Sequence, residues 1–240
     1  MIDWLRPELY DPVVEVGGQA LPMAIKRHPT ARRMTLRLAP DGREVRVTIP
    51  KWGRTREALE FARSRAEWLE TQLAKVEQPQ APIPGSILTF RGEDLAVDWQ
   101  QGHPRRVQRE GERLLVGGPL EALPARLERW LKAEARELMA ADLAEYCQRA
   151  NVPTPNIALS GAQRRWGSCS TSGTVRINWR LVMAPDAVRR SVVAHEVAHL
   201  VHFDHSPAFH ALLGDLFEGD LKAADRWLKR QGRSLYRHFG

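Results

Sequence analysis

The sequence predicts an α+β fold in which a β-rich N-terminal part precedes a part built from helices and antiparallel strands. Apolar and polar residues alternate over 34–38 and again over 45–49, on either side of Pro40-Asp41-Gly42. This period of two around a turn sequence predicts a β-hairpin with one buried face. Over 54–77 and 119–150 the apolar residues instead recur every three or four positions, which predicts amphipathic helices.

The N-terminal region, residues 1–118, is expected to be β-rich with one helix. Its extended segments fall at three places, namely 12–50, 87–99 and 105–118. Gly17-Gly18 supplies a turn within the first of them. The single helix is expected over 54–77, and the prolines of residues 79–84 then indicate a linker or a long turn.

The C-terminal region, residues 119–240, is expected to combine helices with a second hairpin, and to pack with residues 1–118 as one compact unit. The hairpin should lie within 157–182, with its turn at Thr171-Ser172-Gly173. Pro185 and Pro207 suit the first turn of a helix, and Ser206 suits the capping position before Pro207. Helices are expected over 119–150, from Pro185 to about Val201, from Pro207 to Phe217, and over 220–231.

The composition is that of an ordinary globular protein. Of the 240 residues, 43% are hydrophobic and 27% are charged, and the length allows a sizeable core. No apolar stretch has the length of a membrane span and the first residues do not resemble a secretory signal, so we expect a cytoplasmic protein without a membrane partner. The net charge of +7 is compatible with proximity to nucleic acid. Cys147 and Cys169 are expected to be free thiols.

A cluster of histidines is the strongest functional signal. Five of the eight histidines lie between His195 and His210, and His195-Glu196-Val197-Ala198-His199 forms an HExxH motif. On a helix, positions four apart share one face, so both imidazoles can reach one Zn²⁺ ion. Glu196 is then placed to take a proton from water and not to bind the metal.

Catalytic zinc usually has three protein ligands and one open position, and the sequence offers three candidates for the third ligand. His205 follows His199 by six residues, the spacing of the metzincin pattern, although that pattern has glycine where this chain has His202. We therefore expect His205 as the third ligand. His202 and Glu218 are its rivals.

The segment around the motif resembles the YgjP-like zinc metallopeptidase family. The resemblance rests on Trp166-Gly167-Ser168-Cys169, Asn178-Trp179, Pro185, the HExxH motif, and His205-Ser206 with Phe209, and it is dense over residues 160–213. It implies a zincin-like α+β fold with an active-site helix, and three-histidine ligation with His205 as third ligand. The family is similar to SprT- and Wss-type proteases, some of which act on DNA-bound proteins.

The expected function is that of a zinc-dependent metallopeptidase, with Zn²⁺ as cofactor, a peptide or protein as substrate and Glu196 as general base. Residues 119–240 would be its catalytic region. The segment 176–181 (RINWRL) is a candidate edge strand for pairing with an extended peptide, although an ordinary core strand is the alternative. Three residues are candidates for substrate binding: Arg165, Asn178 and Trp179.

Two other functions remain open at the level of the sequence. One is a metal-dependent hydrolase of nucleotides or phosphoanhydrides that uses the same histidines. The other is a nucleic-acid-associated module whose zinc is structural. Glu196 distinguishes this last function from the enzymes, because a structural zinc site has no need of a base.

Overall fold

The computed structural model describes residues 12–39, 42–74, 80–163, 165–170 and 173–239. Its contacts divide the chain into two compact units, Met1–Pro79 with Gly240 and Gln80–Phe239. The division falls within the proline-rich segment, whereas we expected a boundary between residues 118 and 119. The reason is that the strands over 87–116 share one hydrophobic core with the helices that follow them. The α+β fold is confirmed.

The first unit is built on a four-stranded mixed sheet. Its strands are β1 (Val13–Val16), β2 (Gln19–His28), β3 (Thr35–Leu38) and β4 (Val45–Pro50). They lie in the order β1-β2-β4-β3, with an antiparallel pair at each edge and the parallel pair β2/β4 in the centre. Gly17 and Gly18 have φ of 55° and 78°, so this tight turn uses the left-handed backbone that glycine adopts without strain.

Two helices, α1 (Thr55–Arg63) and α2 (Ala66–Leu73), pack on this sheet, where one helix over 54–77 was expected. The single-helix prediction is wrong at Ser64-Arg65. The Ser64 hydroxyl donates to the carbonyl of Phe61 at 2.8 Å, and Arg65 has φ −114° and ψ 17°, outside the helical range. Serine competes with the helical backbone in this way. Residues 75–77 lie outside the described residues.

The second unit begins with another four-stranded sheet of the same topology. Its strands are β5 (Ile87–Phe90), β6 (Glu93–Trp99), β7 (Gln108–Glu110) and β8 (Arg113–Val116). They lie in the order β5-β6-β8-β7, again with antiparallel edge pairs around a parallel centre. Arg91 and Gly92, with φ of 53° and 80°, form a turn equivalent to Gly17-Gly18. The first hairpin of each unit, β1/β2 and β5/β6, therefore has the same kind of turn.

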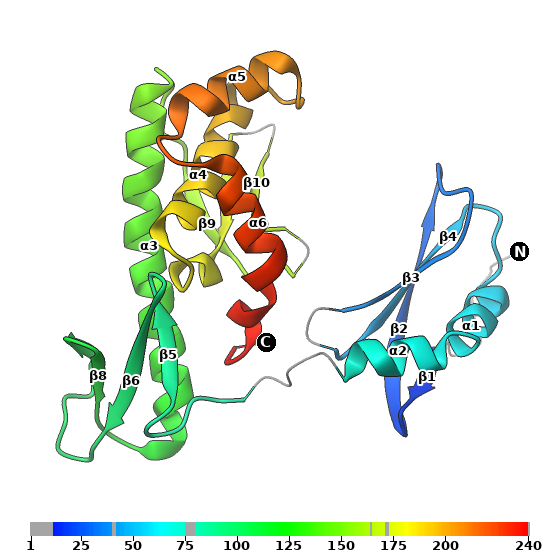
Figure 1. Cartoon of the computed structure of the whole chain (residues 1–240), viewed down its shortest axis with the longest axis horizontal. Helices are drawn as coiled ribbons and strands as arrows, with labels where there is room; N and C mark the ends of the chain where they lie inside the picture. Colours follow the sequence, from blue (N-terminus) through cyan, green and yellow to red (C-terminus); the bar gives the residue numbers. More distant parts are fainter. Residues whose placement is uncertain (1–11, 40–41, 75–79, 164, 171–172, 240) are drawn as a thin grey trace, which may run out of the picture. The chain divides into compact units, whose positions relative to one another are not determined.

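The long helix α3 (Leu123–Arg149) follows a short 3₁₀ turn, η1 (Leu120–Ala122), and is the longest helix of the second unit (Figure 1). Five of its completely buried residues recur every four positions, as expected of an amphipathic helix: Leu123, Leu127, Leu131, Ala135 and Met139. This spacing places one apolar stripe along the helix. The stripe continues through Met139 and not through Leu138, which is only partly buried.

A three-stranded sheet carries the segment that resembles the YgjP-like family. It contains β9 (Ile157–Ser160), β10 (Gly167–Cys169) and β11 (Val175–Asn178) in the order β10-β11-β9. The hairpin β10/β11 agrees with the sequence prediction, although Thr171 and Ser172 of its turn lie outside the described residues. The chain then leaves the extended conformation earlier than expected, because Trp179–Val182 form a 3₁₀ turn, η2.

Three helices complete the unit, close to their expected bounds: α4 (Asp186–Val201), α5 (Pro207–Leu216) and α6 (Leu221–Gln231), with a final 3₁₀ turn η3 (Gly232–Tyr236). Ser206 caps α5 by accepting from the Phe209 N–H, as predicted. α4 packs against α3, α5, α6 and β10, so the helix with the HExxH motif is supported on several sides. No helix in the described ranges has the length and apolar character needed to cross a membrane.

Candidate metal centre

Three imidazoles meet beside α4. His195 and His199 lie one turn apart on this helix, and His205 lies in the loop before α5. Nε2 of His195 is 3.1 Å from Nε2 of His199 and 3.4 Å from Nε2 of His205. Each residue offers a ring nitrogen, and the three nitrogens lie within 4.8 Å of one another. The structure thus brings together the three histidines that the sequence singled out.

The spacing of these nitrogens fits a tetrahedral cation. Zinc–nitrogen distances of about 2.0–2.1 Å at tetrahedral angles place two ligand nitrogens about 3.3–3.4 Å apart. The two separations of 3.1 and 3.4 Å agree with this value. A set of three imidazole ligands leaves one tetrahedral position open, as catalytic zinc sites do.

Two further contacts hold the imidazoles in place. The ring of Phe209, which is completely buried, lies 4.5–5.0 Å from the rings of all three histidines, centroid to centroid. Nδ1 of His199 lies 3.0 Å from the backbone carbonyl of His202. A carbonyl acceptor at Nδ1 keeps the proton on that nitrogen and leaves the Nε2 lone pair free for a metal, which is the usual arrangement around ligand histidines.

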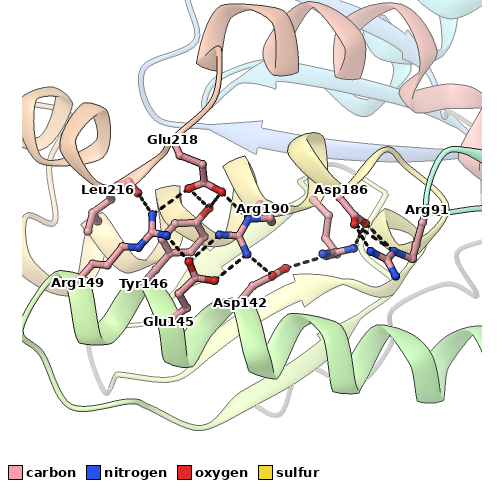
Figure 2. A network of polar contacts seen from close by, with 10 residues as sticks. Arg91, Asp142, Glu145, Tyr146, Arg149, Asp186, Arg190, Leu216 and Glu218 are labelled. Atoms are coloured by element: carbon pink, nitrogen blue, oxygen red, sulfur yellow. Dashed lines mark hydrogen bonds and ion pairs between the residues drawn. The ribbon is translucent and has the colours of Figure 1, made fainter.

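The two rival ligands lie elsewhere. His202 ends α4 with φ −127° and ψ 108°, so its side chain does not continue the helical face on which His199 lies. Its backbone carbonyl contacts Nδ1 of His199. The Glu218 carboxylate accepts hydrogen bonds from Tyr146, Arg149 and Arg190 (Figure 2). Neither residue belongs to the cluster that the described residues form.

Burial sets the protonation of His195. Burial lowers the pKa of its imidazole to about 4, and the neighbouring His199 and His205 lower it further in the same direction. The ring is therefore neutral at pH 7. A neutral imidazole is the form that binds a metal ion.

Glu196 lies next to this cluster with an unusual environment. It is only 5% exposed, and burial raises the pKa of its carboxyl group to about 7, although Arg165 and the Cys169 backbone N–H act in the opposite direction. Among the residues that the structure describes, no hydrogen-bond partner contacts its buried Oε2 atom. A buried carboxylate oxygen without a partner is costly, and such groups are typical of functional sites.

The comparison with protein families decides the identity of the chain. The model of the YgjP-like family, metallopeptidase domain, matches residues 32–231. This chain belongs to the YgjP-like metallopeptidase family. Membership supports a hydrolase with a metal cofactor and a peptide substrate, and the three-histidine cluster is a place where a metal ion can bind. No curated protein matched the sequence, and no solved structure matched it.

In this YgjP-like chain the edge strand beside the site is β10 and not the segment 176–181. β11 is the central strand, paired with β9 on one side and β10 on the other, so RINWRL does not supply an edge strand and the alternative of an ordinary core strand is the correct one. The Trp166 carbonyl accepts from the Asn178 N–H at 2.7 Å, and the Ser170 N–H donates to Thr174 at 3.0 Å. In this antiparallel alternation, the intervening backbone groups of β10 point away from β11.

Two of the three predicted substrate-binding residues lie in the core of the domain. Asn178 is completely buried, and its side chain binds the Ala162 carbonyl, the Tyr236 hydroxyl and the Arg180 N–H. Trp179 is 3% exposed and packs against Phe239. A substrate cannot reach either side chain, so we correct that prediction. Asn178 ends the central strand β11 and Trp179 begins the 3₁₀ turn that follows it, and both pack in the core of the domain.

Arg165 differs from these two residues, because it is exposed and its charge acts on the Glu196 carboxylate. It stays a candidate for substrate binding.

A buried polar network fixes the HExxH helix against α3 (Figure 2). Asp142 accepts hydrogen bonds from Arg189 Nε at 2.7 Å and Arg190 Nη1 at 3.0 Å. Arg190 also binds Glu145 and Glu218, so one arginine of α4 connects α3 with the segment before α6. The sequence analysis missed this network. Paired charges on two distant helices give no local signal.

The roles of two other residues of the site, Gly167 and Phe209, were also not predicted. Gly167 lies against Glu196 so closely that a β-carbon there would be 2.3 Å from Oε1. Phe209 was part of the family resemblance, but its position four residues after His205 gave the only hint that it packs against the histidine cluster.

Proposed function

We propose that this chain is a zinc-dependent metallopeptidase in which His195, His199 and His205 hold the metal and Glu196 is the general base. The observation that carries the proposal is the agreement between the nitrogen separations of 3.1 and 3.4 Å and a tetrahedral zinc site, with a buried carboxylate beside it. Bound zinc would supply Lewis-acid chemistry, polarising the scissile carbonyl and acidifying the attacking water.

Glu196 moves the proton in this mechanism. Its carboxylate accepts a proton from the attacking water and later donates it to the nitrogen of the leaving amine. A pKa raised to about 7 suits both steps, because near neutral pH the group can accept the proton and release it again. Burial of the carboxylate also keeps its Oε2 atom free of competing protein donors among the described residues.

The β10 edge is the proposed guide for the peptide backbone. Gly167 and Cys169 alternate with the residues that pair with β11, so the backbone groups of Gly167 and the carbonyl of Cys169 face the open side of the strand. The Cys169 N–H acts on the Glu196 carboxylate, and therefore a peptide that pairs with β10 passes close to the base. Such pairing orients a substrate without reading its sequence.

Other functions receive less support. The family match favours a peptide substrate over a nucleotide or phosphoanhydride. A purely structural zinc site does not require the buried Glu196 carboxylate beside its ligands. Proximity to nucleic acid and a cytoplasmic location rest on the sequence alone and stay predictions.

The test is Glu196→Gln, with Glu218→Gln as the matched control. Zinc per chain and hydrolysis of an unfolded protein are measured on the same samples. We expect Glu196→Gln to keep its zinc and to lose at least about 100-fold in hydrolysis, the usual contribution of a general base. Glu218→Gln should keep zinc and hydrolysis. Loss of zinc from Glu196→Gln would instead place Glu196 among the ligands, and unchanged hydrolysis would exclude it as the base.

A further inference from the structure

A cavity of about 520 Å³ opens beside the histidine cluster. His195 and Glu196 form part of its lining, so it is continuous with the proposed reaction centre. Cavities of roughly 300–1,000 Å³ are typical of sites that bind small ligands or side chains. The proposed mechanism uses only His195 and Glu196 of this lining, and it assigns no ligand to the rest of the cavity.

Apolar side chains from three helices and from the segment before β10 form much of the remaining wall: Trp166 before β10, Val192 on α4, Leu213 on α5, and Leu221 and Leu228 on α6. Val192 and Glu196 are four residues apart and share one face of α4. The same spacing logic places Leu221 and Leu228, two turns apart, on one face of α6. The cavity therefore has a largely apolar wall on the side of these residues, and the base Glu196 also lines it.

Two of the polar groups around the cavity, Ser191 and Asp225, are engaged elsewhere, and His210 and Lys222 are further polar residues of its lining. The Ser191 hydroxyl donates to the Val188 carbonyl at 2.8 Å, and Asp225 forms an ion pair with Lys229 at 2.6 Å. Lys222 is exposed on α6. A charged guest would lose its hydration against the apolar part of the wall, whereas an apolar guest would remove its own surface and that of the wall from water.

Trp166 is held firmly in this wall. A β-carbon at Gly232 would lie 2.8 Å from Cζ2 of Trp166, so the indole packs directly on the backbone of η3. The ring of Tyr236 lies 5.9 Å from it on the same side, centroid to centroid. The C-terminal turn thus fixes the shape of the cavity, as a site that selects its guest by shape requires.

We propose that this cavity is the specificity pocket of the enzyme and takes a large apolar side chain from the residue adjoining the scissile bond. The proposal rests on the proposed function. A peptide paired with β10 places its scissile carbonyl near Glu196, and alternate side chains of an extended peptide then point to the face on which α4 lies. The side chain next to the cleaved bond meets the space between Trp166, α4 and α6.

The pocket can be filled from α6. Leu228 is half-buried and lines the cavity, so Leu228→Trp should occupy the space that the guest uses. Leu212→Trp is the matched control, because Leu212 is also half-buried but does not line the cavity. A second variant, Leu228→Arg, places a positive charge in the wall and tests the chemistry of the pocket separately from its volume.

The activity test uses zinc-loaded enzyme and peptides that carry Phe, Leu, Ala, Asp or Lys on either side of the cleaved bond. We expect kcat/KM for Phe or Leu at one of these two positions to exceed that for Asp or Lys at least about tenfold. In Leu228→Trp, kcat/KM should be highest for the Ala peptide and no longer for Phe or Leu. In Leu228→Arg, kcat/KM should be highest for the Asp peptide. Leu212→Trp should keep the wild-type order. An equal rate for all peptides, or an unchanged order in both Leu228 variants, overturns the proposal.

A binding test separates the pocket from the proposed function. Peptides with Phe or Asp at the same position are titrated into zinc-loaded Glu196→Gln protein, with and without Leu228→Trp, and the dissociation constants are compared. We expect Leu228→Trp to weaken binding of the Phe peptide at least tenfold and to leave the Asp peptide unchanged. If wild type cleaves nothing, the proposed function fails and this titration alone decides the pocket. Equal binding with and without Leu228→Trp rejects it.

Discussion

Gly167 and Glu196 are in such close contact that a β-carbon on Gly167 would lie 2.3 Å from Oε1 of the carboxylate. The strand β10 and the helix α4 therefore meet at a point where no side chain fits. Gly167 does not have a positive φ, so its need for glycine comes from this contact and not from its backbone conformation. The edge strand can approach the proposed base this closely only because residue 167 has no side chain.

We expect Gly167→Ala to reduce peptide hydrolysis by on the order of 100-fold, because a displacement of about 1 Å at the reacting groups has an effect of this size. Zinc content should stay near the wild-type value, since Gly167 does not contact the histidines. The measurement is kcat/KM together with zinc per chain. Gly161→Ala is the control, because a β-carbon there would meet only Arg180 Nη1, at 3.8 Å. Similar activity of the two variants would contradict the account.

Asp142 and Arg189 form the buried ion pair that fixes α4 on α3, with side chains 6% and 3% exposed. We expect Asp142→Asn to lower the free energy of unfolding by about 3 kcal/mol, because loss of one partner leaves the other charge buried. Urea unfolding of metal-free protein measures this. Asp225→Asn removes an exposed pair with Lys229 and should cost less than about 1 kcal/mol. Equal losses in the two variants would show that the buried network does not stabilise the fold.

Glu218 should make the stability of the protein depend on acid pH. Burial acts to raise the pKa of its carboxyl group, but hydrogen bonds from Arg190 and Tyr146 outweigh burial and lower the pKa to about 2 from the ordinary 4.5. The unfolded chain therefore binds this proton more readily than the folded chain does. The stabilisation is complete above pH 4.5 and is lost as the pH falls toward 2.

The variant Glu218→Gln tests this dependence. Its deficit in unfolding free energy relative to wild type should be present at pH 7 and should shrink steadily below pH 4.5. Unfolding by urea at a series of pH values gives both curves. Glu110→Gln, which removes an exposed carboxylate 3.8 Å from Arg113, is the control. A deficit for Glu218→Gln that is the same at pH 7 and pH 3 would refute the assigned role of the carboxylate.

The sequence predicted those parts of the molecule whose signals are local. The apolar period gave α3, the HExxH motif lay on a helix that ends at Val201 as expected, and Ser206-Pro207 marked the start of α5. Each of these signals lies within a few residues of the structure that it predicts. The three histidines of the cluster were also expected from the sequence, although their spacing left His202 and Glu218 as rivals for the third position.

What failed depended on contacts between distant segments. The residue pattern of a strand does not show which strands pair with it, so β11 was a candidate edge strand although β9 pairs with it on the side away from β10. The same limit hid the shared strand order of the two four-stranded sheets. The burial of Asn178 follows from this central position. The break at Ser64 was missed because the apolar period continues across it.

The central claim is that His205 completes a three-histidine zinc site, and zinc content tests it most directly. Zinc per chain is measured by elemental analysis for wild type, His205→Ala and His202→Ala, after dialysis against a weak chelator. We predict about one zinc per chain in wild type and in His202→Ala, whose backbone carbonyl still orients His199, and loss of zinc from His205→Ala. Full zinc in His205→Ala together with loss from His202→Ala would contradict the account.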